Sequence, residues 1–263
     1  MSELKIIQEA VVEERKQPYI DQCSENTLID YVASDFEIPF PKGYSIQFSS
    51  SLEKTFAKSY GPCNVSPLNE FEEKDSFEYD FSFQGDVRFP FRYRVFKLMN
   101  LYIPGRKNLK FKFDFNIKHF SQFTEEEKKE INERIQYEHC MKNSRFCIAP
   151  RGAGIQSIRF FEALAVSTIP IYMGPKETKF PLDWIIDWDK ACFRIDNTVS
   201  MNGEYMRVFD NLMRIPIDQL NERRKYIFEI YNKYLRNSEI EKEETYKEIR
   251  RIHAEETKTA VPQ

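Results

Sequence analysis

The sequence lacks the features that mark several large functional classes. Its formal net charge is only −3, with 39 basic and 42 acidic residues mixed along the chain, so no long-range positive field attracts nucleic acid. No apolar run approaches the ~20 residues that a membrane-spanning helix needs, and the charged first residues do not resemble a signal peptide. We therefore expect a soluble, cytoplasmic protein with no membrane span and no nucleic-acid partner.

Catalytic motifs of common hydrolases are also absent. The chain contains no Gly-x-Ser-x-Gly, no His-Glu-x-x-His and no Walker loop. His119 and His139 have no nucleophile motif beside them, so a structural role is the better interpretation of each. These absences argue against hydrolysis by a serine nucleophile or by a zinc ion.

Cysteines are present but unpaired in sequence, and they do not form a metal motif. The five cysteines are widely spaced, odd in number and without a Cys-x-x-Cys pair, which favours reduced thiols in the core. Cys140 and Cys147 with His139 are a poor zinc set. Asp187 and Asp189, on either side of a tryptophan, are compatible with a divalent metal, but a solvated loop is the better interpretation. We expect no metal site.

The most informative stretch of the sequence lies between Ser144 and Gly174. An apolar run from Phe146 to Ala149 leads into a Pro-Arg-Gly-Ala-Gly loop, a helical pattern, and a second apolar run from Thr168 to Met173. This order indicates a βαβ unit, whose loop lies where such units bind phosphate. On pattern alone, an anion site and a tight turn are equally good interpretations of the loop.

The same alternation extends upstream of this unit. It predicts strands at 77–83 and 109–117 and helices at 91–101 and 124–142, so that residues 77–174 have the order β-α-β-α-β-α-β. Such an order is typical of a parallel sheet with right-handed crossovers. The sequence therefore predicts an α/β fold.

The flanking regions have weaker patterns. We predict a helix at 3–16 and a strand at 27–33 before the sheet, and after it an aromatic segment at 182–193, three helices at 203–214, 218–236 and 239–256, and a frayed end at 257–263. Three parts follow from this: an N-terminal domain over residues 1–75, a nucleotide-binding domain over 76–215, and C-terminal helices over 216–263. The C-terminal helices could complete the short N-terminal domain.

Two predicted strand ends carry glycines. Gly85 ends one strand, and Gly152 and Gly154 follow another, in a fold whose ligands bind beyond the carboxyl ends of the strands. Glycines let backbone amides approach a phosphate, and the next helix adds its positive dipole end.

Charged and hydroxyl side chains accompany the second glycine loop. Arg151 and Arg159 supply positive charge and Ser157 supplies a hydroxyl donor, which together suit a diphosphate without a metal ion. Glu162 follows Arg159 by three residues on a helix, so it could pair with that arginine at the surface or accept hydrogen bonds from a ribose diol.

Several stretches of this chain resemble known sequences. Phe146-Cys-Ile-Ala-Pro-Arg-Gly152, Ser157-Ile-Arg-Phe-Phe-Glu-Ala-Leu164 and Thr168-Ile-Pro-Ile-Tyr172 resemble the donor-site signature of exostosin-type glycosyltransferases. The segment from Tyr79 to Gly85 with the later Pro90-Phe-Arg92, and the segment from Phe180 to Trp188, also resemble parts of that family. The resemblance covers about residues 77–196.

This resemblance implies a GT-B-like fold with two Rossmann-like domains and parallel sheets, of which the N-terminal one is abridged here. It also implies an inverting, metal-independent transfer from a UDP-sugar donor to a glycan acceptor, with no further cofactor. The donor-binding residues that it implies are Gly85, Arg88, Arg92, Arg151, Gly152, Gly154, Ser157, Arg159 and Glu162, with Glu162 on the ribose.

Inversion needs a base on the acceptor hydroxyl. Asp35 is the first candidate, although an aspartate that caps a turn is as good an interpretation, and Glu37 and Asp86 are the next candidates. The compact chain resembles bacterial or algal-virus members of the family, which suggests a xylosyltransferase of viral or surface glycans as one specific activity. Alternatives are a GDP-fucose-dependent fucosyltransferase-like enzyme and a nucleotide-sugar-binding module without catalysis.

Overall fold

The structure is a computed structural model that describes residues 45–47, 55–57, 59, 65–86, 92, 95, 111–116, 124–126, 136–151, 157–196 and 204–259. Its centre is a five-stranded, fully parallel sheet with the strand order β4-β3-β5-β6-β7. The strands are β3 Tyr79–Asp86, β4 Phe111–Asn116, β5 Ser144–Pro150, β6 Ile169–Gly174 and β7 Phe193–Asp196. The predicted α/β class with a parallel sheet is confirmed.

Strands β5 and β6 are buried on both faces, which is why they appear in the sequence as continuous apolar runs. Phe146 pairs with Ile169, whereas Cys147 and Ala149 pair with Pro170 and Tyr172. Because successive side chains of a strand alternate between faces, these two sets lie on opposite sides of the sheet.

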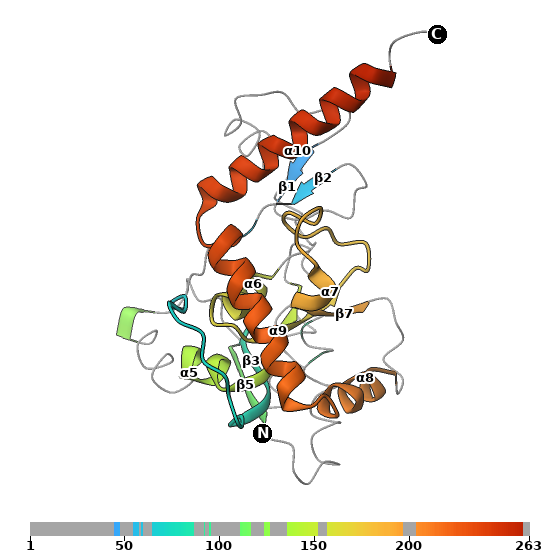
Figure 1. Ribbon diagram of the computed structural model, residues 1–263. Coiled ribbons are helices and arrows are strands. Elements are labelled where there is room, and N and C mark those ends of the chain that lie inside the picture. The colour runs from blue at the N-terminus through green and yellow to red at the C-terminus, as the bar shows by residue number, and fades with distance from the viewer. Residues whose placement is uncertain are drawn as a thin grey trace.

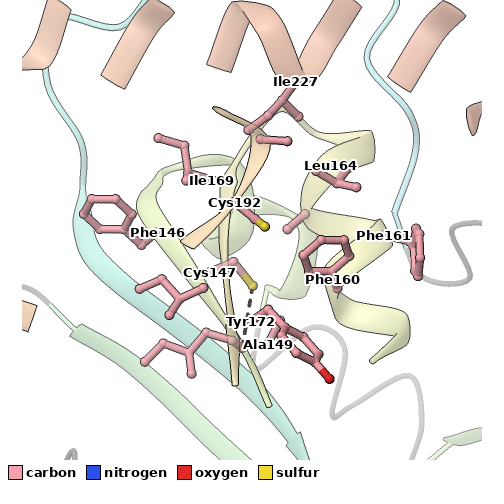
Figure 2. Close-up of a cluster of buried hydrophobic side chains, with 14 of the residues drawn as sticks. Phe146, Cys147, Ala149, Phe160, Phe161, Leu164, Ile169, Tyr172, Cys192 and Ile227 are labelled. Carbon is pink, nitrogen blue, oxygen red and sulfur yellow. Dashed lines mark hydrogen bonds between the residues drawn. The ribbon is translucent and has the colours of Figure 1, made fainter. Parts of the chain in front are cut away.

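Helices cover both sides of the sheet. Helix α6, Ile158–Ala165, contributes Phe160, whose ring lies edge-on to Tyr172, at 6.1 Å between centroids. Helix α8, Glu204–Met213, contributes Phe209, which lies edge-on to Phe81, at 5.2 Å, on the other side. Figure 2 shows Phe160, Phe161 and Leu164 of α6 in one cluster with strand residues and with Ile227 from α9, Ile217–Ile230. The sheet is therefore the middle layer of the fold.

The remaining helices are α5 Tyr137–Lys142, α7 Trp188–Ala191, α9 Ile217–Ile230 and α10 Ser238–Thr259, with a π-helix, η3 Tyr231–Leu235, between α9 and α10. In Figure 1, α9 runs in front of the sheet while α10 extends away from it. None of the described helices is both long enough and apolar enough to cross a membrane.

Two predictions about these elements are wrong in detail, and one strand was not predicted. The helix predicted over 124–142 is not continuous, because Gln136 has the left-handed angles φ 46° and ψ 51° directly before α5. The segment 182–193 was not predicted to lead into a strand, yet β7 follows it and pairs with β6. The end predicted to fray is helical up to Thr259, the last residue of α10.

Helix α9 is joined to the sheet by a segment that precedes β3. Leu68 N donates to Ala165 O at 2.9 Å, and Asn221 of α9 exchanges two hydrogen bonds with the backbone of Lys74, at 3.1 and 3.0 Å. Arg224, only 2% exposed, donates to the carbonyls of Ser167 and Glu72, both at 3.2 Å. Its guanidinium therefore connects three parts of the chain.

We expect Arg224→Lys to destabilise the protein by about 2 kcal/mol, because a single ammonium cannot reach all the acceptors that the guanidinium fork satisfies and leaves buried carbonyls unpaired. Urea denaturation measures the change in free energy of unfolding. Arg250→Lys, at an exposed position of α10, is the matched control. Equal stability of the two variants would contradict the bridging role.

The described N-terminal elements are two short parallel strands, β1 Ser45–Gln47 and β2 Thr55–Ala57. Phe56 lies edge-on to Trp184, at 5.7 Å, and Ser59 donates from its backbone N to Glu241 Oε1 of α10 at 2.7 Å. Figure 1 shows α10 passing beside this strand pair. The predicted helix at 3–16 and strand at 27–33 lie outside the described residues, and the three-part domain division stays a prediction.

Candidate functional site

The strand order of the sheet reverses between β3 and β5. These two strands pair from Tyr79↔Ser144 to Ser82↔Cys147. Beyond that point β3 continues beside β4 to Asp86↔Asn116, and β5 continues beside β6 to Pro150↔Met173. In parallel α/β sheets, ligands bind outside the carboxyl ends of the strands at such a reversal. Gly85 is the penultimate residue of β3, and Asp86 is the last. The backbone of both residues therefore lies at this edge.

The start of α6 brings two polar donors to the same edge. Ser157 is the N-cap residue of α6, yet its hydroxyl makes no capping bond, and the residue is only 1% exposed. Within the described part of the chain, neither Ser157 Oγ nor Arg159 Nε has a hydrogen-bond partner. Buried donors without partners are rare in folded proteins and call for an explanation such as a ligand. An anion at the N-terminus of α6 would satisfy both.

The Arg159 guanidinium lies over two aromatic rings. Its Cζ is 4.7 Å from the ring centroid of Phe83 on β3 and 5.9 Å from that of Tyr137 on α5. Burial alone would lower the pKa of this guanidinium, but the surrounding Tyr137, Cys147 and Glu162 outweigh burial and raise the pKa. Arg159 is therefore a fixed positive charge at the strand reversal.

Two further predicted arginines meet at the end of β5. Arg92 Nε donates to the backbone oxygen of Arg151 at 3.2 Å, and Arg151 N donates to Met173 O at 2.9 Å, which extends the ladder between β5 and β6. The structure thus brings Arg92 to Arg151, which follows it by 59 positions in the sequence.

Glu162 is not a surface residue. It is 1% exposed, and its Oε2 accepts a hydrogen bond from the hydroxyl of Tyr137. The interpretation of Arg159 and Glu162 as a surface ion pair is therefore wrong. Burial, followed by the effect of the Glu162 charge, raises the pKa of Tyr137, so its hydroxyl stays protonated and donates. Tyr137 thus contacts two of the predicted site residues, which the sequence did not indicate.

A cavity of about 410 Å³ opens beside the end of β6. It is lined by Lys176, Glu177, Thr178, Lys179, Phe180, Asp183 and Arg194. Thr178 Oγ1 is hydrogen-bonded to the Tyr172 hydroxyl at 2.8 Å, and its backbone oxygen accepts from Arg194 Nη1 at 3.3 Å. The volume lies in the range of small-molecule sites.

One member of the acidic pair in the aromatic segment, Asp187, has a structural role. Asp187 caps α7 by accepting hydrogen bonds from the backbone N of Asp189 and Lys190, each at 3.2 Å. In the described ranges, no group of three or more His, Cys, Asp or Glu side chains could hold a metal ion. Cys140, Cys147 and Cys192 are buried free thiols, as predicted, and burial raises the pKa of Cys147 to about 12.

Some predicted site residues cannot be placed. Asp35, Glu37, Arg88, Gly152 and Gly154 lie outside the described residues, as does His119. Of the three candidate bases, only Asp86 has a described backbone, at the carboxyl end of β3.

Known proteins are similar to part of this chain. Residues 105–207 match the family model of the Exostosin GT47 domain. Exostosin-1 of Drosophila melanogaster is 29% identical over 102 residues, which are 39% of this chain and 13% of that protein. The Exostosin-1 homolog of Caenorhabditis elegans is 27% identical over 108 residues, which are 41% of this chain and 27% of that protein. The match thus spans well under a third of either relative.

One similar solved structure is that of TarM. The alignment covers 75% of this chain and 39% of the TarM chain, with a TM-score of 0.42 and 14% identity. The family match over residues 105–207 includes Arg151, Ser157, Arg159 and Glu162 but not Gly85 or Arg92. Through residues 105–207, the chain is therefore similar to the exostosin-type glycosyltransferases.

Proposed function

We propose that the protein is a glycosyltransferase that moves a sugar from a UDP-sugar to a hydroxyl of a glycan acceptor, with inversion at the anomeric carbon. The observation that carries the proposal is the pair of buried donors without described partners, Ser157 Oγ and Arg159 Nε, at the strand reversal. The match of residues 105–207 to the Exostosin GT47 domain supports the class of reaction. A GT-B arrangement, in which a second α/β unit containing β1 and β2 faces the sheet, belongs to the same proposal.

In this proposal the donor diphosphate lies at the N-terminus of α6. Ser157 donates to a phosphate oxygen, and Arg159 and Arg151 oppose the charge that builds up on the leaving UDP. Arginine side chains can perform this neutralisation, so the transfer needs no divalent metal. The cavity beside β6 would hold the transferred sugar, for which xylose is one candidate.

The acceptor hydroxyl must lose a proton as it attacks the anomeric carbon from the side opposite UDP. A carboxylate at the carboxyl edge of the sheet or on the N-terminal side has to take that proton. Asp86 ends β3 at the strand reversal, and Asp35 and Glu37 remain the candidates from the N-terminal part.

We expect UDP to raise the melting temperature of the protein and GDP to leave it nearly unchanged, in the presence of EDTA. A ligand at about 100 times its Kd stabilises the folded state by about 2.7 kcal/mol. For a chain of this size, that corresponds to a shift of about 5–10 °C. Stabilisation by GDP alone would favour the fucosyltransferase-like alternative, and a requirement for manganese would contradict metal independence.

Turnover distinguishes an enzyme from a binding module. The enzyme should hydrolyse its UDP-sugar slowly without an acceptor, and a panel of UDP-sugars that includes UDP-xylose identifies the donor by UDP release. Binding of UDP without any release from the panel would support the non-catalytic alternative.

A further inference from the structure

The guanidinium of Arg194, on β7, is held in place at the cavity beside β6. Its Cζ lies 4.4 Å from the ring centroid of Phe180, and its Nη1 donates to the backbone oxygen of Thr178 at 3.3 Å. Phe180 is 1% exposed and stacked on Phe160 at 4.7 Å, so the core fixes the ring beneath the guanidinium. Arg194 is nevertheless an exposed residue, and the bond to Thr178 uses only one of the five N–H groups of a guanidinium. Other N–H groups of Arg194 can therefore donate to a ligand in the cavity.

The remaining polar groups of the cavity include both donors and acceptors of hydrogen bonds. Lys176 supplies an ammonium and Glu177 a carboxylate. Lys179 Nζ lies 3.5 Å from Asp183 Oδ2, so these two charges largely offset each other. A sugar presents hydroxyl groups, each of which can donate as well as accept. The lining therefore suits a sugar, and Arg194 adds a donor whose position is fixed before the sugar binds.

Tyr172 connects this cavity with the loop after β5. Its hydroxyl is hydrogen-bonded to Thr178 Oγ1 at 2.8 Å, and Thr178 Oγ1 donates to Pro175 O, also at 2.8 Å. Burial raises the pKa of Tyr172 to about 12. The hydrogen bond to Thr178 and the charges of Arg151 and Arg194 act in the opposite direction, so both guanidinium groups lie within electrostatic reach of this hydroxyl. A donor whose phosphates contact Arg151 can thus extend its sugar towards Arg194.

We propose that Arg194 is a specificity-determining residue that donates hydrogen bonds to the transferred sugar, and that Thr178 is the positioning residue that holds it there. The inference rests on the proposed function, in which this cavity receives the sugar. Thr178 holds the arginine through its backbone oxygen, and its hydroxyl is bonded to Tyr172 and Pro175. A side chain held in this way loses little conformational entropy on binding, so more of the free energy of its bond to the sugar contributes to affinity.

The test measures by calorimetry the affinities for UDP and for the UDP derivatives of xylose, glucose, N-acetylglucosamine and glucuronic acid. In Arg194→Met, which keeps a side chain over Phe180 but removes the charge, UDP should bind as in the wild type. The affinity for the UDP-sugar that the wild type binds most tightly should fall by about 10-fold, the effect of one hydrogen bond to a charged group. Thr178→Val should lower that affinity by about 3-fold, and Thr178→Ser, which keeps the hydroxyl, should restore it.

The matched control is Arg223→Met on α9. The Arg223 guanidinium also lies over a phenylalanine ring, that of Phe193 at 4.6 Å, and it also donates to backbone oxygens, those of Asp189 and Lys190. Arg223 does not belong to the cavity lining. Its replacement should therefore leave the affinities for UDP and for the UDP-sugars unchanged.

Several outcomes would overturn the inference while the proposed function stands. These are an equal loss of UDP-sugar affinity in Arg194→Met and Arg223→Met, an equal loss of UDP and UDP-sugar affinity in Arg194→Met, and no loss in Arg194→Met. A wild type that binds UDP but none of the UDP-sugars would also overturn it, because a cavity that receives the sugar should accept one of them. A wild type that binds no uridine nucleotide would refute the proposed function and the inference together.

Discussion

Replacing Arg159 with alanine should lower the transfer rate at subsaturating donor by about 100-fold or more, while the protein stays folded. Removing one charged donor from a transition-state site has an effect of this size. The guanidinium is the fixed positive charge at the start of α6, and its Nε has no described partner that would explain a structural role. Arg159→Lys should recover only part of the activity, because the ammonium lacks the planar fork and the stacking on Phe83.

Activity is measured as UDP release at a donor concentration well below KM, and folding by circular dichroism and melting temperature. Arg250→Ala, which removes an exposed arginine of α10, is the control and should keep wild-type activity. Normal turnover in Arg159→Ala would refute the assignment of the phosphate site, whereas an unfolded variant would assign Arg159 to stability.

Replacing the next residue, Phe160, should instead destabilise the whole protein strongly. Its ring is 1% exposed, is stacked on Phe180 at 4.7 Å with an interplanar angle of 4°, and lies 5.7 Å from the ring of Trp188. Phe160→Ala removes these contacts and leaves a cavity, which costs about 3–5 kcal/mol. Whole domains are stable by only about 5–15 kcal/mol, so this loss is a large part of the margin.

Urea denaturation monitored by tryptophan fluorescence measures this change, because Trp188 belongs to the same aromatic cluster. The control lies on the same helix: Ile158 is 42% exposed, so Ile158→Ala should change the free energy of unfolding by no more than about 0.5 kcal/mol. A Phe160→Ala variant as stable as Ile158→Ala would show that the aromatic cluster does not carry the stability assigned to it.

The sheet was largely predictable from the sequence, because its signals are local. The apolar runs at β5 and β6 and the aromatic alternation in β3 each specify a strand by themselves. Strand β7 was missed because its four residues, Phe193 to Asp196, are too few to show a period. Gln136 was missed for another reason: no glycine or proline marks the left-handed turn, and surrounding structure imposes it.

The site was predictable where one segment provides it. Arg151, Ser157 and Arg159 follow one another along the loop and helix after β5, so the motif indicated them together. Tyr137 could not be found in this way, because it lies on a separate helix and reaches Glu162 only through tertiary packing. The exposure of Glu162 was mispredicted because spacing along α6 gives a face of the helix but not what covers that face.

The contact between Ser59 and Glu241 of α10 depends on the number of residues in the π-helix η3. Helix α9 is anchored in the core through Leu220 and Ile227, while Glu241, Thr245 and Ile249 form the buried face of α10. Each residue added to or removed from an α-helix turns everything beyond it by about 100°. A single deletion within residues 231–235 would therefore rotate Glu241 away from Ser59 although every side chain in that contact is unchanged. The wider turn of η3 therefore sets the rotation of α10 relative to α9, and with it the side of α10 that faces Ser59. We expect insertions and deletions within η3 to be rarer among natural sequences than substitutions.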